Sequence, residues 1–175
     1  MRRLFWLFGL FLLVAGSAQA QKGETPAVEV AGGLSILRNG ATAPNNSMYT
    51  GWQASLTANL RKRFGITADF GGQYRSIAGT GVSQYEYLFG PQISARTERV
   101  TGFAHALFGG NSFRAPGGSL GGFAMGFGGG VDANLKHPFA IRVIQVDYIP
   151  ARVSGIWYSD LRLGFGVVYK FGKTR

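Results

Sequence analysis

The sequence predicts an all-β fold, namely an eight-stranded antiparallel up-and-down transmembrane β-barrel preceded by a cleaved signal peptide. Three observations predict it. Apolar and polar residues alternate with a period of two, which places successive side chains on opposite faces of a strand. Glycine contributes 28 of 175 residues, although soluble domains average about 7 % and glycine weakens helices. Aromatic residues reach 14 % and charged residues only 15 %, against about 25 % charged in soluble domains.

Residues 1–20 have the features of a secretory signal peptide. Arg2 and Arg3 precede an apolar run at residues 4–14, which is too short to span a bilayer as a helix and so disfavours the alternative of an N-terminal anchor. The small residues of Ala18-Gln19-Ala20 fit a cleavage site. We therefore expect a signal peptide at 1–20 and a barrel domain at 21–175. The absence of cysteine excludes a disulfide scaffold.

Eight segments of the remaining 155 residues have strand character. The clearest is 161–171, where every odd position is apolar, and four others alternate cleanly: 52–60, 66–75, 84–96 and 123–135. Three are less regular. Segment 27–37 contains Gly32-Gly33, segment 100–109 has an ambiguous phase, and segment 140–149 is apolar on much of both faces. Strands of about 9–11 residues cross a bilayer, so eight of them fit this length.

The predicted connections alternate in length. Short links lie at 61–65, 97–99 and 136–139, and longer loops rich in Gly, Asn, Ser and Pro are expected at 38–50, 76–83, 110–121 and 150–157. This alternation is typical of an up-and-down meander. An even number of strands places both ends of the barrel chain on one side.

The composition of the two faces favours a membrane barrel over its alternative, a soluble lipocalin-like barrel. A soluble barrel carries many charges on its outer face, whereas the polar face here is mainly Gly, Ser, Thr, Asn, Gln and Ala. A barrel must close in lipid because an open edge leaves backbone groups unpaired. Aromatic residues near the strand ends match interfacial girdles: Trp52, Tyr74, Tyr85, Tyr87, Tyr148, Trp157, Tyr158 and Tyr169.

The chain resembles the outer-membrane β-barrel domain of the OmpA-like superfamily, in a single-domain form without a peptidoglycan-binding domain, over about residues 26–172. The resemblance rests on the eight amphipathic strands and on the last one. Its alternating residues resemble the signal read by the outer-membrane assembly machinery: Leu161, Leu163, Phe165, Val167, Tyr169 and Phe171. Four residues follow Phe171, which departs from the usual terminal aromatic.

The resemblance implies a location in the outer membrane of a diderm bacterium and a structural or surface-interaction role. The implied partners are outer-membrane lipid, lipopolysaccharide and the assembly machinery, and the implied state is a monomer. Surface contact is expected through loops 38–50 and 110–121.

Several charged residues share the inward phase of the predicted strands, and we expect them to form a network in the lumen: Asp69, Glu86, Asp147, Arg61, Arg75, Arg96 and Arg162. Charges in a crowded lumen must pair, because desolvation is otherwise costly. Side chains fill the interior of an eight-stranded barrel, which favours a plug. The alternative is a narrow ion or small-solute pore.

The sequence predicts no enzyme, cofactor or metal site. His105 and His137 are the two histidines, and neither has a carboxylate at ligand spacing. His105 is expected to be a hydrogen-bonded lumen residue, with Phe103 and Leu107 on the same face. The alternative makes it the catalytic base of an outer-membrane lipid-modifying enzyme.

Nucleic-acid binding is not expected either. Losing Arg2 and Arg3 lowers the net charge from +10 to +8, and the one basic cluster is Arg61-Lys62-Arg63. A continuous basic face with exposed aromatics is missing. Basic residues scattered at strand ends are instead expected to attract lipid phosphates.

Overall fold

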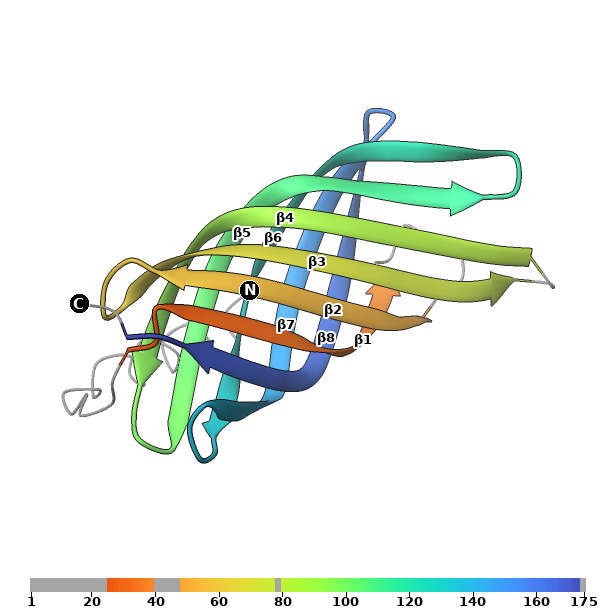
Figure 1. Cartoon of the computed structure of the whole chain (residues 1–175). Coiled ribbons are helices and arrows are strands. Elements are labelled where there is room, and N and C mark those ends of the chain that lie inside the picture. Colours follow the sequence, from red (N-terminus) through yellow and green to blue (C-terminus); the bar gives the residue numbers. More distant parts are fainter. Residues whose placement is uncertain (1–24, 40–47, 78–79, 174–175) are drawn as a thin grey trace, which may run out of the picture.

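The structure, a computed structural model, describes residues 25–39, 48–77 and 80–173 and forms one closed antiparallel barrel. Each strand pairs with its neighbours in sequence, and β8 closes the barrel on β1 (Figure 1). The strands are β1 (Val28–Asn39), β2 (Met48–Asn59), β3 (Phe64–Ile77), β4 (Thr80–Arg96), β5 (Val100–Ala115), β6 (Gly118–Asn134), β7 (Phe139–Val153) and β8 (Ile156–Phe171). The predicted fold class is confirmed. The signal peptide expected at 1–20 lies outside the described residues.

Three of the four long loops expected from the sequence are wrong, because strands continue through most of each of them. β5 runs to Ala115 and β6 begins at Gly118, so most of 110–121 is a hairpin. Ser154 and Gly155 alone join β7 to β8, with φ of 50° and 84°. Positive φ at both positions lets a two-residue turn match the twist of the strands. β3 runs to Ile77 and β4 begins at Thr80, with Ser76 paired to Gly81, so most of 76–83 is strand as well. Residues 40–47, within the remaining expected loop, and 78–79 are outside the described part.

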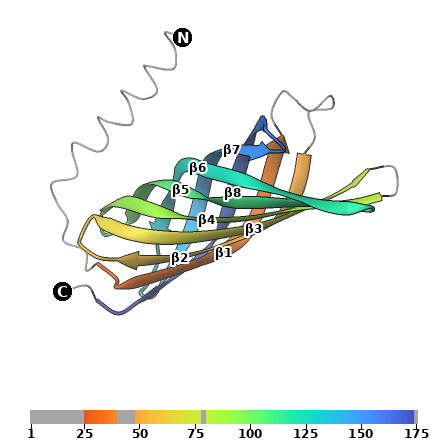
Figure 2. The same cartoon turned by 90° about the horizontal axis from the view of Figure 1, so that it is seen from above.

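The two ends of the barrel differ. The turn end carries the connections at 60–63, 97–99 and 135–138, together with the start of β1 and the end of β8. The loop end carries the other connections, and there the hairpins β3–β4 and β5–β6 extend beyond the other strands (Figures 1 and 2). No helix among the described residues is long and apolar enough to cross a bilayer, an observation that does not bear on crossing by strands.

The barrel is apolar outside and polar inside. Among the described residues, 34 large hydrophobic side chains are exposed, while 24 buried residues are polar or charged against 12 that are hydrophobic. Soluble proteins bury their large apolar residues and rarely leave contiguous apolar surface of this extent in water.

The structure resolves the phase of segment 100–109. Phe103, His105 and Leu107 are all buried in the lumen, while Ala104, Ala106 and Phe108 alternate with them. Phe108 is the large apolar residue of the outward set and is 46 % exposed. His105 thus lies inside together with Phe103 and Leu107.

A β-bulge in β7 explains why segment 140–149 is apolar on both faces. The register against β8 shifts between Arg142 and Gln145, so that Val143 and Ile144 are both exposed. Arg142 and Gln145 both point inward and are buried. An extra residue in one strand reverses the alternation beyond it.

Candidate functional site in the barrel interior

The centre of the lumen is organised by Arg162 of β8, whose side chain is fully buried. Its guanidinium donates to Asp69 Oδ1 of β3 at 2.6 Å, to Glu86 Oε2 of β4 at 3.2 Å and to Asp147 Oδ2 of β7 at 2.8 Å. Arginine presents several donors in a fixed plane, which suits it to join several carboxylates. One side chain therefore ties four strands together across the interior.

Asp147 also holds His105. Its Oδ1 lies 2.8 Å from His105 Nε2, and its Oδ2 accepts a 2.8 Å bond from Gln145 Nε2. His105 Nδ1 is buried without a hydrogen-bond partner among the described groups. The carboxylate orients the imidazole within the lumen.

A second arginine, Arg142 of β7, forms another layer closer to the turn end. Its partner in the β-ladder is Gly166, which follows Arg162 along β8 toward that end. Its Nε and Nη2 donate to the two carboxylate oxygens of Asp132 at 2.8 and 3.2 Å. Its Nη1 donates to Gln145 at 2.8 Å, and its guanidinium lies 4.3 Å from the centre of the Phe103 ring.

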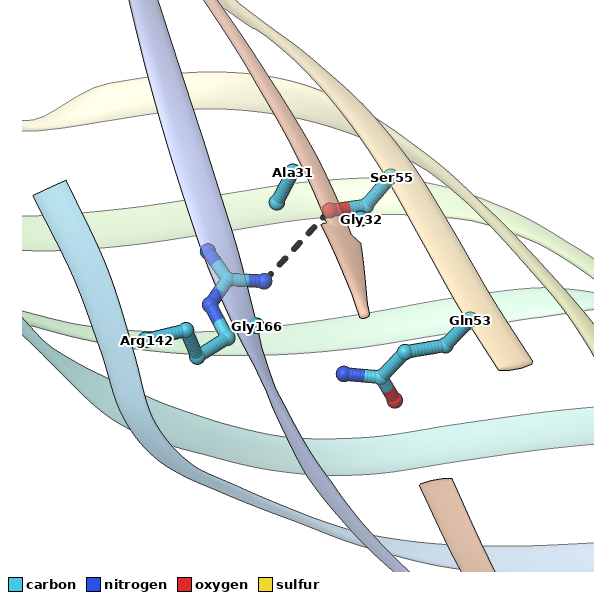
Figure 3. Close-up of a pocket in the computed structure, with 6 residues that line it drawn as sticks. All are labelled: Ala31, Gly32, Gln53, Ser55, Arg142 and Gly166. Atoms are coloured by element: carbon cyan, nitrogen blue, oxygen red, sulfur yellow. Dashed lines mark hydrogen bonds between the residues drawn. The ribbon is translucent and has the colours of Figure 1, made fainter. Parts of the chain in front are cut away.

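Figure 3 shows the space beside this layer, where Arg142 reaches toward Ser55 of β2 with a hydrogen bond of 3.4 Å. The residues that line it are Ala31, Gly32, Gln53, Ser55, Arg142 and Gly166. The space is too small to admit a water molecule. This space therefore provides no path for water beside Arg142.

The third layer lies at the turn end and is built on Arg96. Its Nη2 lies 2.6 Å from Glu29 Oε1 and 2.9 Å from Asn59 Oδ1. Its Nη1 donates to the backbone carbonyl of Lys62 at 2.9 Å, and Asn59 also donates to Glu29. These bonds join β1, β2 and β4 to the connection at 60–63, which contains Lys62.

The residues expected in one lumen network lie at four different places. Asp69, Glu86, Asp147 and Arg162 meet at the centre, and Arg96 lies inside but contacts Glu29 instead. Arg61 lies exposed in the turn after β2 and not in the lumen, because β2 ends at Asn59. Arg75 is half-buried near the loop end, 5.8 Å from the centre of the Tyr49 ring.

Sequence reasoning missed four charged members of the interior: Glu29, Asp132, Arg142 and Asp160. Arg142 and Asp147 are five positions apart, so unbroken alternation assigns them to opposite faces, and the bulge brings them to the same face. Glu29 in β1 and Asp132 in β6 occupy inward positions of the alternation, as their burial shows. The alternation alone could therefore have identified both.

The expected girdle residues form contacts at both ends of the outer surface. At the loop end Trp52 Nε1 donates to the Tyr74 hydroxyl at 3.3 Å, the rings of Tyr74 and Tyr85 lie 6.0 Å apart, and Arg114 lies 5.4 Å from the Tyr85 ring. At the turn end Tyr169 packs on Phe139 and Phe171 at 5.1 and 4.5 Å.

The other members of the expected girdle differ among themselves. Tyr87, Tyr148 and Trp157 are exposed on the outer surface. Tyr158 follows Trp157 directly and pairs with the buried Ala151, so it lies on the lumen side rather than in the girdle. Adjacent strand residues cannot share a face.

Most acidic residues of the described part lie in the interior of the barrel. Of the seven acidic residues in the described part, six are buried in the lumen, namely Glu29, Asp69, Glu86, Asp132, Asp147 and Asp160. Within this part, no group of three or more His, Cys, Asp or Glu side chains has a geometry that could hold a metal ion. The interior thus contains cross-strand ion pairs and hydrogen bonds of amide side chains.

Three solved structures share this fold at low sequence identity. Ail, the attachment invasion locus protein of Yersinia pestis, matches with a TM-score of 0.52 and 16 % identity, covering 83 % of this chain and all of Ail. Neisserial surface protein A gives 0.67 and 14 %, covering 86 % and 100 %. The outer membrane protein OprG of Pseudomonas aeruginosa gives 0.56 and 11 %, covering 87 % and 99 %. No protein-family model and no curated protein matches the sequence.

Proposed function

We propose that the chain is a small integral barrel of the bacterial outer membrane with a structural or surface-interaction role. The apolar outer surface, wrapped around a polar interior, carries this proposal, because such a surface is stable only in lipid. The similar barrels include one named as an outer membrane protein and one named as a surface protein. The turn end then faces the periplasm and the loop end faces outward.

Membrane fractionation combined with a heat-modifiability gel tests this proposal. We expect the mature protein in the outer-membrane fraction, with unheated samples migrating differently from boiled ones because the closed barrel resists the detergent. Recovery of folded protein in the soluble periplasmic fraction would contradict it and favour the lipocalin-like alternative.

The proposed partners are those of an outer-membrane barrel. Lipopolysaccharide and other outer-membrane lipids would contact the loop end, where Arg114 and Arg152 are exposed on the outer face. Ail has been solved in complex with the heparin analogue sucrose octasulfate, an anionic ligand. We further propose that the assembly machinery reads β8, and that the barrel is a monomer.

We also propose that the protein is not an enzyme. His105, the candidate base, is held by Asp147 inside the lumen, away from the lipid that it would have to reach. A narrow pore remains the second candidate, favoured by the polar lining of the lumen. An unaltered lipid A profile on expression of wild-type and His105→Ala protein is the expected result, whereas a His105-dependent change would contradict it.

A further inference from the structure

The basic cluster Arg61-Lys62-Arg63 is part of a larger surface at the turn end. Exposed basic side chains occupy each connection there and the segment after β8; we name this set the turn rim: Arg61, Lys62, Arg63, Arg99, Lys136 and Lys173. Glu98 is the one exposed acidic residue in the described part of the chain, since the six others are buried. Six exposed cations against one exposed acid make the turn rim strongly positive.

The backbone of the turn rim is held in place by hydrogen bonds. Arg96 donates to the carbonyl of Lys62 at 2.9 Å, and Ser94 N donates to the carbonyl of Arg63 at 2.8 Å. The carbonyl of Arg99 accepts from Asn134 N at 2.7 Å. These bonds fix the backbone of Lys62, Arg63 and Arg99 against the ends of the strands.

Large apolar side chains bracket these charges. Leu60 and Phe64, on either side of Arg61-Lys62-Arg63, are 62 % and 57 % exposed. Leu135 and Phe139, around Lys136, are 55 % and 48 % exposed. Apolar residues at these positions belong in hydrocarbon, so the adjoining cationic groups lie at the level of the headgroups, as long basic side chains do at membrane interfaces.

We propose that the turn rim binds the phosphate groups of anionic phospholipids in the leaflet next to the turn end. The inference rests on the proposed membrane location and adds a lipid class and a leaflet to it. Each Lys or Arg close to an anionic membrane strengthens association about fivefold. A peptidoglycan strand, the other anionic candidate, would lie beyond the headgroups, whereas the bracketing apolar residues place the charges among them.

A reporter tryptophan at the turn end tests the proposal. Phe64→Trp is introduced into the barrel domain, residues 21–175, whose two tryptophans, Trp52 and Trp157, are replaced by phenylalanine. The refolded barrel is placed in vesicles of phosphatidylcholine that contain brominated phosphatidylglycerol or brominated phosphatidylcholine. Quenching by the two lipids gives their relative binding constant beside the turn rim.

We expect phosphatidylglycerol to be preferred several-fold at low salt. The triple substitution Arg61→Gln, Lys62→Gln, Arg63→Gln should remove most of this preference, as should about 1 M NaCl, which shortens the Debye length to about 3 Å. The matched control, Arg38→Gln with Arg114→Gln and Arg152→Gln, removes three exposed charges at the loop end and should leave the preference unchanged.

Equal binding of both lipids at low salt would overturn the proposal. So would a loss of the phosphatidylglycerol preference in the loop-end control as large as that in the triple variant. Sedimentation with isolated peptidoglycan, dependent on the turn rim and without lipid preference, would overturn it in favour of the polymer. If the triple variant does not fold, Lys136→Gln with Lys173→Gln is read with a reporter Phe139→Trp instead. A barrel that inserts without lipid preference contradicts this inference alone, whereas failure to insert contradicts the proposed function.

Discussion

Arg162 compensates the charge of three carboxylates at the centre of the lumen. Among the described residues, no other cation contacts all three. The second interior arginine, Arg142, is committed to Asp132 through two hydrogen bonds. His105 contacts Asp147 alone of the three carboxylates. The central carboxylates therefore depend on one guanidinium.

Replacing this guanidinium with an apolar side chain should destabilise the barrel severely. Arg162→Met leaves Asp69, Glu86 and Asp147 buried without their shared donor, and breaking a buried ion pair costs about 3–5 kcal/mol. Unfolding by urea in detergent, followed as loss of the heat-modifiable band, measures the change. The same substitution at the exposed Arg99 should shift stability by less than about 0.5 kcal/mol. Equal effects at both positions would contradict a compensating role for Arg162.

Glycine at position 128 is required by a close approach between β6 and β7. A Cβ atom there would collide with Asp147 Oδ1 and with the carbonyl oxygen of Val146. Gly128→Ala should therefore cost about 1–3 kcal/mol, as overpacking generally does. Gly102→Ala is the matched control because no atom lies within 4 Å of its added Cβ, and it should be neutral or slightly stabilising. A loss of stability in the control as large as that of Gly128→Ala would remove the steric explanation.

Along the strands, the sequence pattern was informative wherever the alternation is unbroken. It correctly indicated the eight strands and the apolar outer face. Of the seven residues that it placed in one network, four meet around Arg162. It could not reveal the bulge of β7, because one inserted residue looks the same as a segment that is apolar on both faces. It also placed Arg61 inside, since the turn that exposes this residue starts one position before it.

The turn between β7 and β8 gives a test of the shortened connections. Ser154 and Gly155 have positive φ, and a residue with a Cβ in the left-handed region costs about 1–2 kcal/mol. Gly155→Val should lower stability by about this amount, while Ser154→Asn should be neutral or better because Asn is favoured in such turns. Both are measured by urea unfolding. A neutral Gly155→Val would show that 150–157 is the longer loop that the sequence predicted.

At the scale of the whole molecule, charges are separated by location: six acids lie inside with three arginines, the other described bases lie mainly toward the two rims, and apolar side chains cover the outer surface between the rims. A barrel with this distribution needs no charged residue in contact with hydrocarbon, where it would be costly. The distribution also unites the composition features of the sequence. The low fraction of charged residues, the abundant aromatics and the abundant glycine follow from an apolar outer surface and a narrow interior.

The three arginine layers favour the plug over the pore. They occupy different levels along the barrel, at Arg96, Arg142 and Arg162, and the space beside the middle one excludes water. We therefore expect wild-type protein in planar bilayers to show no steady single-channel steps. Steady steps would support the pore, and because the described acids are concentrated in the lumen, such a pore would select cations. Anion-selective steps would contradict both the plug and this charge distribution, since an acidic lining repels anions.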